Sequence, residues 1–78
     1  MTTEQLATSK IRNLSTYEIC EMWQESRYKA DKDGDYNMVL EWIEEVLEER
    51  NEDAFGEWMI ELDQDESMTL APHKFFFN

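Results

Sequence analysis

Residues 36–50 read YNMVLEWIEEVLEER and carry the strongest helical pattern of the chain. From Tyr36 onward the apolar side chains recur at i, i+3, i+4, i+7, i+10 and i+11: Tyr36, Val39, Leu40, Ile43, Val46 and Leu47. Residues three and four apart share one face of an α-helix, so this spacing predicts an apolar stripe about three turns long. We expect this stripe to face the core.

The other side of the same segment is acidic. Its carboxylates are Glu41, Glu44, Glu45, Glu48 and Glu49, and Glu52 follows. Only Arg50 relieves this charge within the segment. Trp42 lies beside the apolar stripe, next to Glu41 and near Glu45, which favours a contact residue at the rim of a binding face. The alternative is that Trp42 joins Trp23 and Trp58 as one of three anchors of a shared core.

Two further helices are predicted from their capping signals. Ser15 and Glu18 have the spacing of a capping box, and Leu14 and Ile19 that of a hydrophobic staple, so a helix should cover residues 15–30. The turn formers of residues 31–35 end it, and Asp35 can cap the helix over 36–50.

A third helix is predicted over residues 52–63, because Asn51 can cap it and the apolar residues continue at helical spacing. Gly56 weakens this helix by about 1 kcal/mol relative to Ala, so it needs packing to persist. Residues 64–78 then form an extended tail that ends in three consecutive Phe, Phe75–Phe77. We expect these rings to fold back over the helices; an exposed docking peptide is the alternative.

The chain is therefore predicted to be one all-α domain, residues 1–78, built from three helices with an extended C-terminal tail. Residues 1–13 form either a short helix or a mobile arm. A chain of 78 residues buries a small core, yet its hydrophobic fraction of 41% is too high for a disordered acidic segment.

Net charge restricts the classes of partner. Nineteen acidic and seven basic residues give a formal charge of −12. Nucleic acid and anionic membrane would both approach against this field, so a basic protein surface is the favoured partner. A single cysteine, Cys20, and the lack of a signal-peptide pattern at the amino terminus favour a cytoplasmic protein.

Chemistry-bearing motifs are weak. Residues 31–35, DKDGD, have the alternating carboxylates of an EF-hand opening, but Tyr36 replaces the required Gly and Trp42 replaces the bidentate Glu. We therefore predict no calcium binding, no metal site and no cofactor. His73 is the only histidine, and the acidic neighbours of Cys20 disfavour a thiolate, so we predict that the chain is not an enzyme.

Residues 39–59, and particularly LEERNEDAFGEW at residues 47–58, resemble a pattern in small acidic helical proteins encoded on bacterial phages and conjugative elements. That pattern is Arg-Asn-Pro-Glu-Ala-Phe with a Trp three residues later and a basic-aromatic ending, which HKFF at residues 73–76 resembles. Glu52 departs from it by replacing the Pro. The resemblance covers about half of the chain and implies a mobile-element origin, while transferring no functional residue.

Proteins of such elements include anti-CRISPR and anti-restriction inhibitors, and by this analogy we expect an inhibitor that mimics nucleic acid and blocks a nucleic-acid-binding complex. The residues expected to bind the partner are Glu41, Glu44, Glu45, Glu48, Glu52 and Trp42. Two readings stay open beside it. The acidic face can serve only solubility, and the chain can be an adaptor that binds through an apolar helix face or through the Phe tail.

Overall fold

The computed structural model describes residues 2–77, and these form five α-helices and no strand. The helices are α1 (Thr3–Arg12), α2 (Thr16–Ala30), α3 (Tyr36–Arg50), α4 (Glu52–Gln64) and α5 (His73–Phe76). The all-α prediction is confirmed. The predicted count of three helices is not exact, because one further helix forms near each end of the chain.

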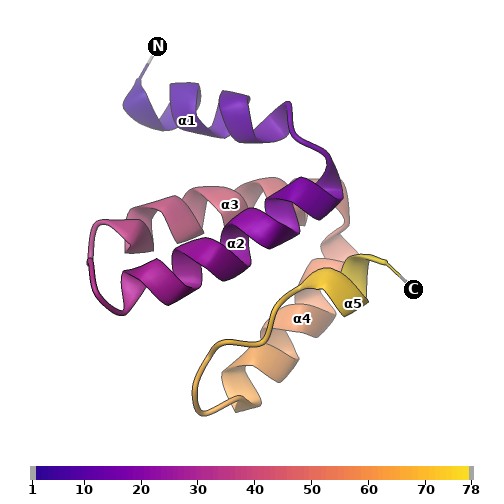
Figure 1. The fold of residues 1–78 in the computed structure, drawn as a ribbon. Coiled ribbons are helices and arrows are strands. Elements are labelled where there is room, and N and C mark those ends of the chain that lie inside the picture. Colours follow the sequence, from indigo (N-terminus) through magenta and orange to yellow (C-terminus); the bar gives the residue numbers. More distant parts are fainter. Residues whose placement is uncertain (1, 78) are drawn as a thin grey trace.

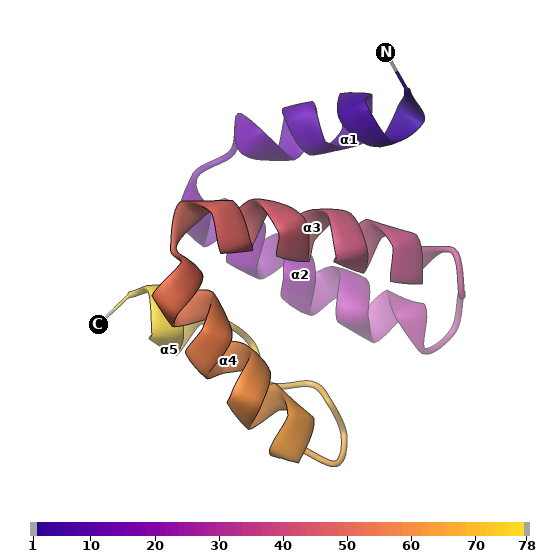
Figure 2. The ribbon, with the colours of Figure 1, turned by 180° about the vertical axis from the view of Figure 1, so that it is seen from behind.

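The α2 and α3 helices form an antiparallel hairpin at the centre of the molecule (Figure 1). α1 packs along α3 on one side of this hairpin, and α4 leaves the end of α3 at an angle on the other side (Figure 2). α5 returns to contact both α4 and α2. The hairpin is therefore covered from two sides by helices that come from opposite ends of the chain.

Local capping explains where the helices begin. The Ser15 hydroxyl accepts the Glu18 N–H at 3.1 Å and the Glu18 carboxylate accepts the Ser15 N–H at 3.0 Å, which confirms the predicted capping box. Asn51 accepts the Ala54 N–H at 3.0 Å and so caps α4 as predicted. A second capping box, between Thr2 and Gln5, starts α1, so the prediction of a short helix within residues 1–13 holds for Thr3–Arg12, while Met1 lies outside the described residues.

The predicted cap at Asp35 is wrong. Asp35 has helical backbone angles, φ −63° and ψ −25°, and its side chain makes no capping hydrogen bond. A side-chain cap requires an extended residue whose oxygen can reach back over the first turn. Instead, carbonyl groups of the turn accept the first N–H groups of the helix. Asp33 O accepts the Tyr36 N–H and Gly34 O accepts the Asn37 N–H, both at 3.1 Å.

The core lies between the hairpin and α4. Trp23 of α2 and Trp58 of α4 are almost fully buried and meet edge to face, with ring centroids 5.0 Å apart. The stripe of α3 supplies four further core residues, Leu40, Ile43, Val46 and Leu47, all buried. This confirms the direction predicted for that stripe. Trp42 is only half-buried and lies outside this aromatic pair.

The segment after α4 is held against the core by hydrogen bonds. The Trp58 indole N–H donates to the Leu70 carbonyl at 2.9 Å, and the Asp65 carboxylate accepts the N–H groups of Thr69 and Leu70. Pro72 is fully buried, while Phe75 and Phe76 pack against the core cluster. The rings therefore fold back as predicted, although the tail is not extended throughout, because α5 forms within it.

Arg50 connects the end of α3 to the link between α1 and α2. Its guanidinium donates to the carbonyl oxygens of Arg12 and Leu14, both at 2.7 Å, and to the Thr16 hydroxyl at 3.0 Å. The side chain is thus aimed at backbone rather than at the neighbouring glutamates. The expectation that Arg50 relieves the acidic side of α3 is not met by these contacts.

Candidate functional site

Three of the predicted glutamates form one exposed row on α3. Glu41, Glu45 and Glu48 are spaced at i, i+4 and i+7, and all three are exposed. Within residues 2–77, none of them has a basic nitrogen within 4.0 Å. We call these three residues the acidic row. Like charges at this spacing repel one another, so the row is a cost to the isolated helix.

Glu44 is placed differently from the acidic row. It is half-buried on the flank of α3 that faces α2, where its carboxylate accepts the Trp23 indole N–H at 3.0 Å. Burial raises the pKa of Glu44, and the hydrogen bond from Trp23 opposes this shift. The Glu44 carboxylate is therefore engaged by the core tryptophan and is less accessible to a partner than the acidic row.

The remaining acidic residues near the row also differ from it. Glu52 is exposed but belongs to the first turn of α4, beyond the break at Asn51, where the helix dipole favours its charge. Glu49 faces α1 and pairs with the Arg12 guanidinium through two hydrogen bonds of 2.8 and 2.9 Å. This pairing lowers the pKa of Glu49 and ties the end of α1 to α3.

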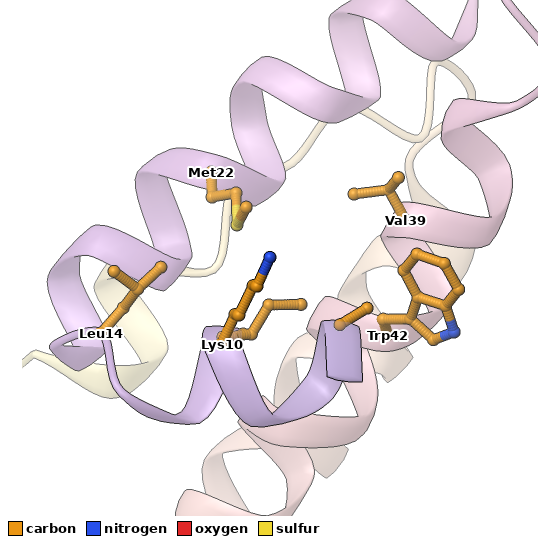
Figure 3. A pocket seen from close by; sticks show the side chains of 7 residues that line it. Lys10, Leu14, Met22, Val39 and Trp42 are labelled. Atoms are coloured by element: carbon orange, nitrogen blue, oxygen red, sulfur yellow. The ribbon is translucent and has the colours of Figure 1, made fainter. Parts of the chain in front are cut away.

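An apolar groove opens where α1 meets the hairpin (Figure 3). Its volume is about 340 Å³. The residues that line it are Ala7, Lys10, Ile11, Leu14, Met22, Val39 and Trp42. We call it the α1 groove. Its walls are almost entirely carbon and sulfur, and the one charged group is the Lys10 amine, which projects between Met22 and Val39.

The α1 groove continues into a second hollow along α2. The two share Leu14 and Met22, and the second is further lined by Tyr17, Glu18, Glu21 and Glu25. All three glutamates are exposed. Each already has one contact: Glu18 in its capping box, Glu21 with His73 at 2.7 Å, and Glu25 with Lys29 at 2.9 Å. An apolar floor thus runs beside a row of carboxylates on α2.

The sequence pattern placed Trp42 correctly beside the apolar stripe but did not identify the groove that it lines. The signal available was Ala7, Ile11 and Leu14, which follow one another at i, i+4 and i+7. These are a small residue and two aliphatic ones, a pattern that predicts an apolar helix face. The stripe is short, and it does not reveal that α1 leaves Met22 and Val39 uncovered.

The structure also places the Cys20 thiol and the carboxylates of residues 31–35. Burial raises the pKa of the Cys20 thiol to about 11, so it is protonated and enclosed at neutral pH. In the turn between α2 and α3, Asp31 pairs with Arg27 at 2.8 Å and Asp33 accepts the Asp35 N–H. Across residues 2–77 no three His, Cys, Asp or Glu side chains form a set that could hold a metal ion. No helix in that part of the chain is both long enough and apolar enough to cross a bilayer.

Comparisons with models of protein families, with curated proteins and with solved structures found no match to this chain.

Proposed function

We propose that this chain is an acidic, non-enzymatic inhibitor from a mobile element, which acts in the cytoplasm on a nucleic-acid-binding defence complex in the manner of an anti-CRISPR protein. The acidic row is the observation that supports this proposal. Its three carboxylates follow one another at about 5 Å along the helix axis, against about 3.4 Å for the phosphates of one nucleic-acid strand. A basic groove built for phosphates would thus meet the row as a run of negative charges with a wider axial spacing.

Charge alone does not make such a surface functional, because an exposed ion pair contributes only about 0–1 kcal/mol. Recognition must come from several carboxylates that act together. Within residues 2–77 no basic nitrogen lies within 4.0 Å of the row, although the charge of Glu45 acts on Arg12, whereas Glu49 is hydrogen-bonded to Arg12 directly.

The test is to replace Glu41, Glu45 and Glu48 by Lys in one variant. All three are exposed and none contributes to the core, so helix content should be unchanged. Binding to the host complex, isolated by affinity capture with the parent chain, should fall by about tenfold or more, mainly through slower association. The matched control replaces Glu57, Glu61 and Glu66, which are also exposed, and changes the net charge equally.

Equal losses in the two triple variants would show that net charge, and not the acidic row, drives association. No loss in the acidic-row variant would leave the row as a solubility device. Raising the salt concentration gives an independent readout, because charge-led binding weakens steeply over the range where the Debye length shortens from about 10 Å to about 3 Å.

The α1 groove supports a second candidate, a non-enzymatic adaptor that binds its partner through an apolar helix face. The Phe tail is a weaker basis for this function, because Phe75 and Phe76 pack against the core and only Phe77 of the three is strongly exposed, at 49%. Binding that barely changes with salt, and that survives reversal of the acidic row, would favour the adaptor.

A further inference from the structure

The α1 groove is an apolar surface that no segment of residues 2–77 covers. α1 is held at its end by the Arg12–Glu49 pair and buries only Thr8 and Ile11. The face of α1 around Ala7 therefore stands beside Met22 and Val39 without closing over them (Figure 3). Leu6, in the same helix, is 50% exposed. The groove therefore offers apolar side chains from three helices that another molecule can contact.

Carboxylates stand on both sides of the groove. On the α2 side, Glu18, Glu21 and Glu25 line the hollow that shares Leu14 and Met22 with it. On the α3 side, Glu45 lies one helical turn after Trp42 and is exposed. The pKa of Arg12 is raised mainly by its hydrogen bond to Glu49. The charge of Glu45 raises this pKa further, so Glu45 also lies close to α1.

An apolar channel between two acidic rims is complementary to one type of occupant. A helix with apolar side chains at i, i+3 or i+4, and i+7 can lay these into a groove, and Lys or Arg on its flanks can then meet the rims. A second copy of this chain fits poorly, because each copy carries a charge of −12. Anionic lipid and nucleic acid meet the same unfavourable field.

We propose that the α1 groove binds one basic amphipathic helix of the partner protein. The proposal rests on the proposed function, since it gives the basic partner a defined recognition element. The apolar side chains of that helix occupy the space between Ala7, Met22 and Trp42. The acidic row guides the partner during approach, and the groove retains it after contact.

Lys10 is the one residue that opposes this occupant by charge. Its side chain projects from α1 into the groove, and its amine can turn out to solvent while the alkyl chain stays in contact with the apolar walls, as long basic side chains commonly do. The Lys10→Glu variant should therefore bind a basic helix at least as tightly as the parent does. A ligand with an acidic head group would instead lose its only cation in the groove.

The probe is a synthetic Leu/Lys peptide of about 18 residues, with Leu at helical spacing along one face. A control peptide of the same composition alternates Leu and Lys, so that its apolar face has the period of a strand. Trp42 is the half-buried indole of the three, and its emission should shift to shorter wavelength when the helical peptide covers it. The Trp42→Phe variant shows whether the signal comes from this residue.

Two matched substitutions on α1 test the location. Ala7→Gln places a longer neutral side chain inside the groove, whereas Ser9→Gln places the same side chain at an exposed position that does not line it. Ala7→Gln should weaken binding of the helical peptide by about tenfold or more, and Trp42→Ala should do the same. Ser9→Gln should change it by less than about twofold.

The proposal is overturned if the alternating peptide binds as tightly as the helical one, or if Ala7→Gln and Ser9→Gln behave alike. It is also overturned if Lys10→Glu abolishes binding of the helical peptide, because an added carboxylate should attract a basic helix. Its failure is distinct from that of the proposed function. If the groove variants retain inhibition and the acidic-row variant loses it, only the groove inference fails. If the groove variants lose inhibition and the acidic-row variant retains it, the groove inference holds and nucleic-acid mimicry fails.

Discussion

α1 and α4 cover opposite sides of the same hairpin, but they do so to very different degrees. α4 has 13 residues and buries Ala54, Trp58 and Leu62, with the Trp58 indole also hydrogen-bonded to the tail. α1 has 10 residues, buries only Thr8 and Ile11, and leaves an apolar groove beside Trp42. The comparison separates the side of the molecule that holds the fold from the side available to a partner.

The largest expected effect is the loss of Trp58. Trp58→Ala should lower the free energy of unfolding by about 3–5 kcal/mol, because it removes a fully buried indole from contact with Trp23. Stability of about 0.05–0.15 kcal/mol per residue is usual, so such a loss approaches the whole stability of a small domain. Urea denaturation followed by circular dichroism measures it.

The matched variant is Trp42→Ala, which removes the same side chain from the other side of the hairpin. It should cost less than half as much, because Trp42 is only half-buried. Labelling of Cys20 provides a second readout, since this buried thiol, with its pKa raised to about 11, should react at neutral pH only after unfolding. Equal losses in the two variants would remove the distinction between the two sides.

Arg50 gives the next largest effect, because it fastens α1 and its link to the hairpin. Arg50→Ala removes three hydrogen bonds, two of them to backbone carbonyls, and should cost about 1–2 kcal/mol. Arg50→Lys keeps the charge but lacks the planar fork, so it should restore little of this loss. Amide hydrogen exchange should show that protection falls in α1 before it falls in α4. Full rescue by Lys would mean that charge alone matters there.

Gly56 tests whether α4 unfolds together with the hairpin. A Cβ added at Gly56 would meet nothing within 4 Å, so Gly56→Ala should raise the free energy of unfolding by about 0.5–1 kcal/mol. Ser9→Ala is the corresponding change in α1 and also favours a helix. It should scarcely move the main thermal transition if α1 opens locally. A gain as large as that from Gly56→Ala would show that α1 belongs to the same cooperative unit.

The sequence predicted the elements whose signals are local. The Ser15 capping box and the Asn51 cap set the starts of α2 and α4, and the stripe from Tyr36 to Leu47 set the core face of α3. These signals act within a single turn or along a single helix, so they need no knowledge of the rest of the chain.

The features that the sequence did not predict depend on contacts between distant residues. α1 begins at its own capping box, but its position against α3 depends on pairs such as Arg12 with Glu49, which are 37 residues apart. The pattern also grouped Glu44 with the acidic row, because helical spacing alone cannot show that Trp23 and the α4 side close over that flank of α3. The α1 groove was not predicted for the same reason, because the residues that line it come from three helices.

The smallest effect concerns Glu44 and Glu45, which are adjacent in sequence but lie on different sides of α3. Burial raises the pKa of Glu44 in the folded state, so its ionisation opposes folding. For a carboxyl group with a raised folded pKa, the associated stability is fully present below the unfolded pKa and is lost as pH rises through the folded pKa. Gln at position 44 stays neutral and can still accept the Trp23 N–H. Glu44→Gln should therefore raise the melting temperature slightly at pH 7, and this gain should disappear as the pH falls below the ordinary Glu range near 4.3.

Glu45→Gln is the exposed control, and its effect should come only from reduced repulsion within the acidic row, so added salt should suppress it. If the Glu44→Gln gain persists at low pH, the Trp23 contact responds to the shape of the side chain and not to the cost of a half-buried charge.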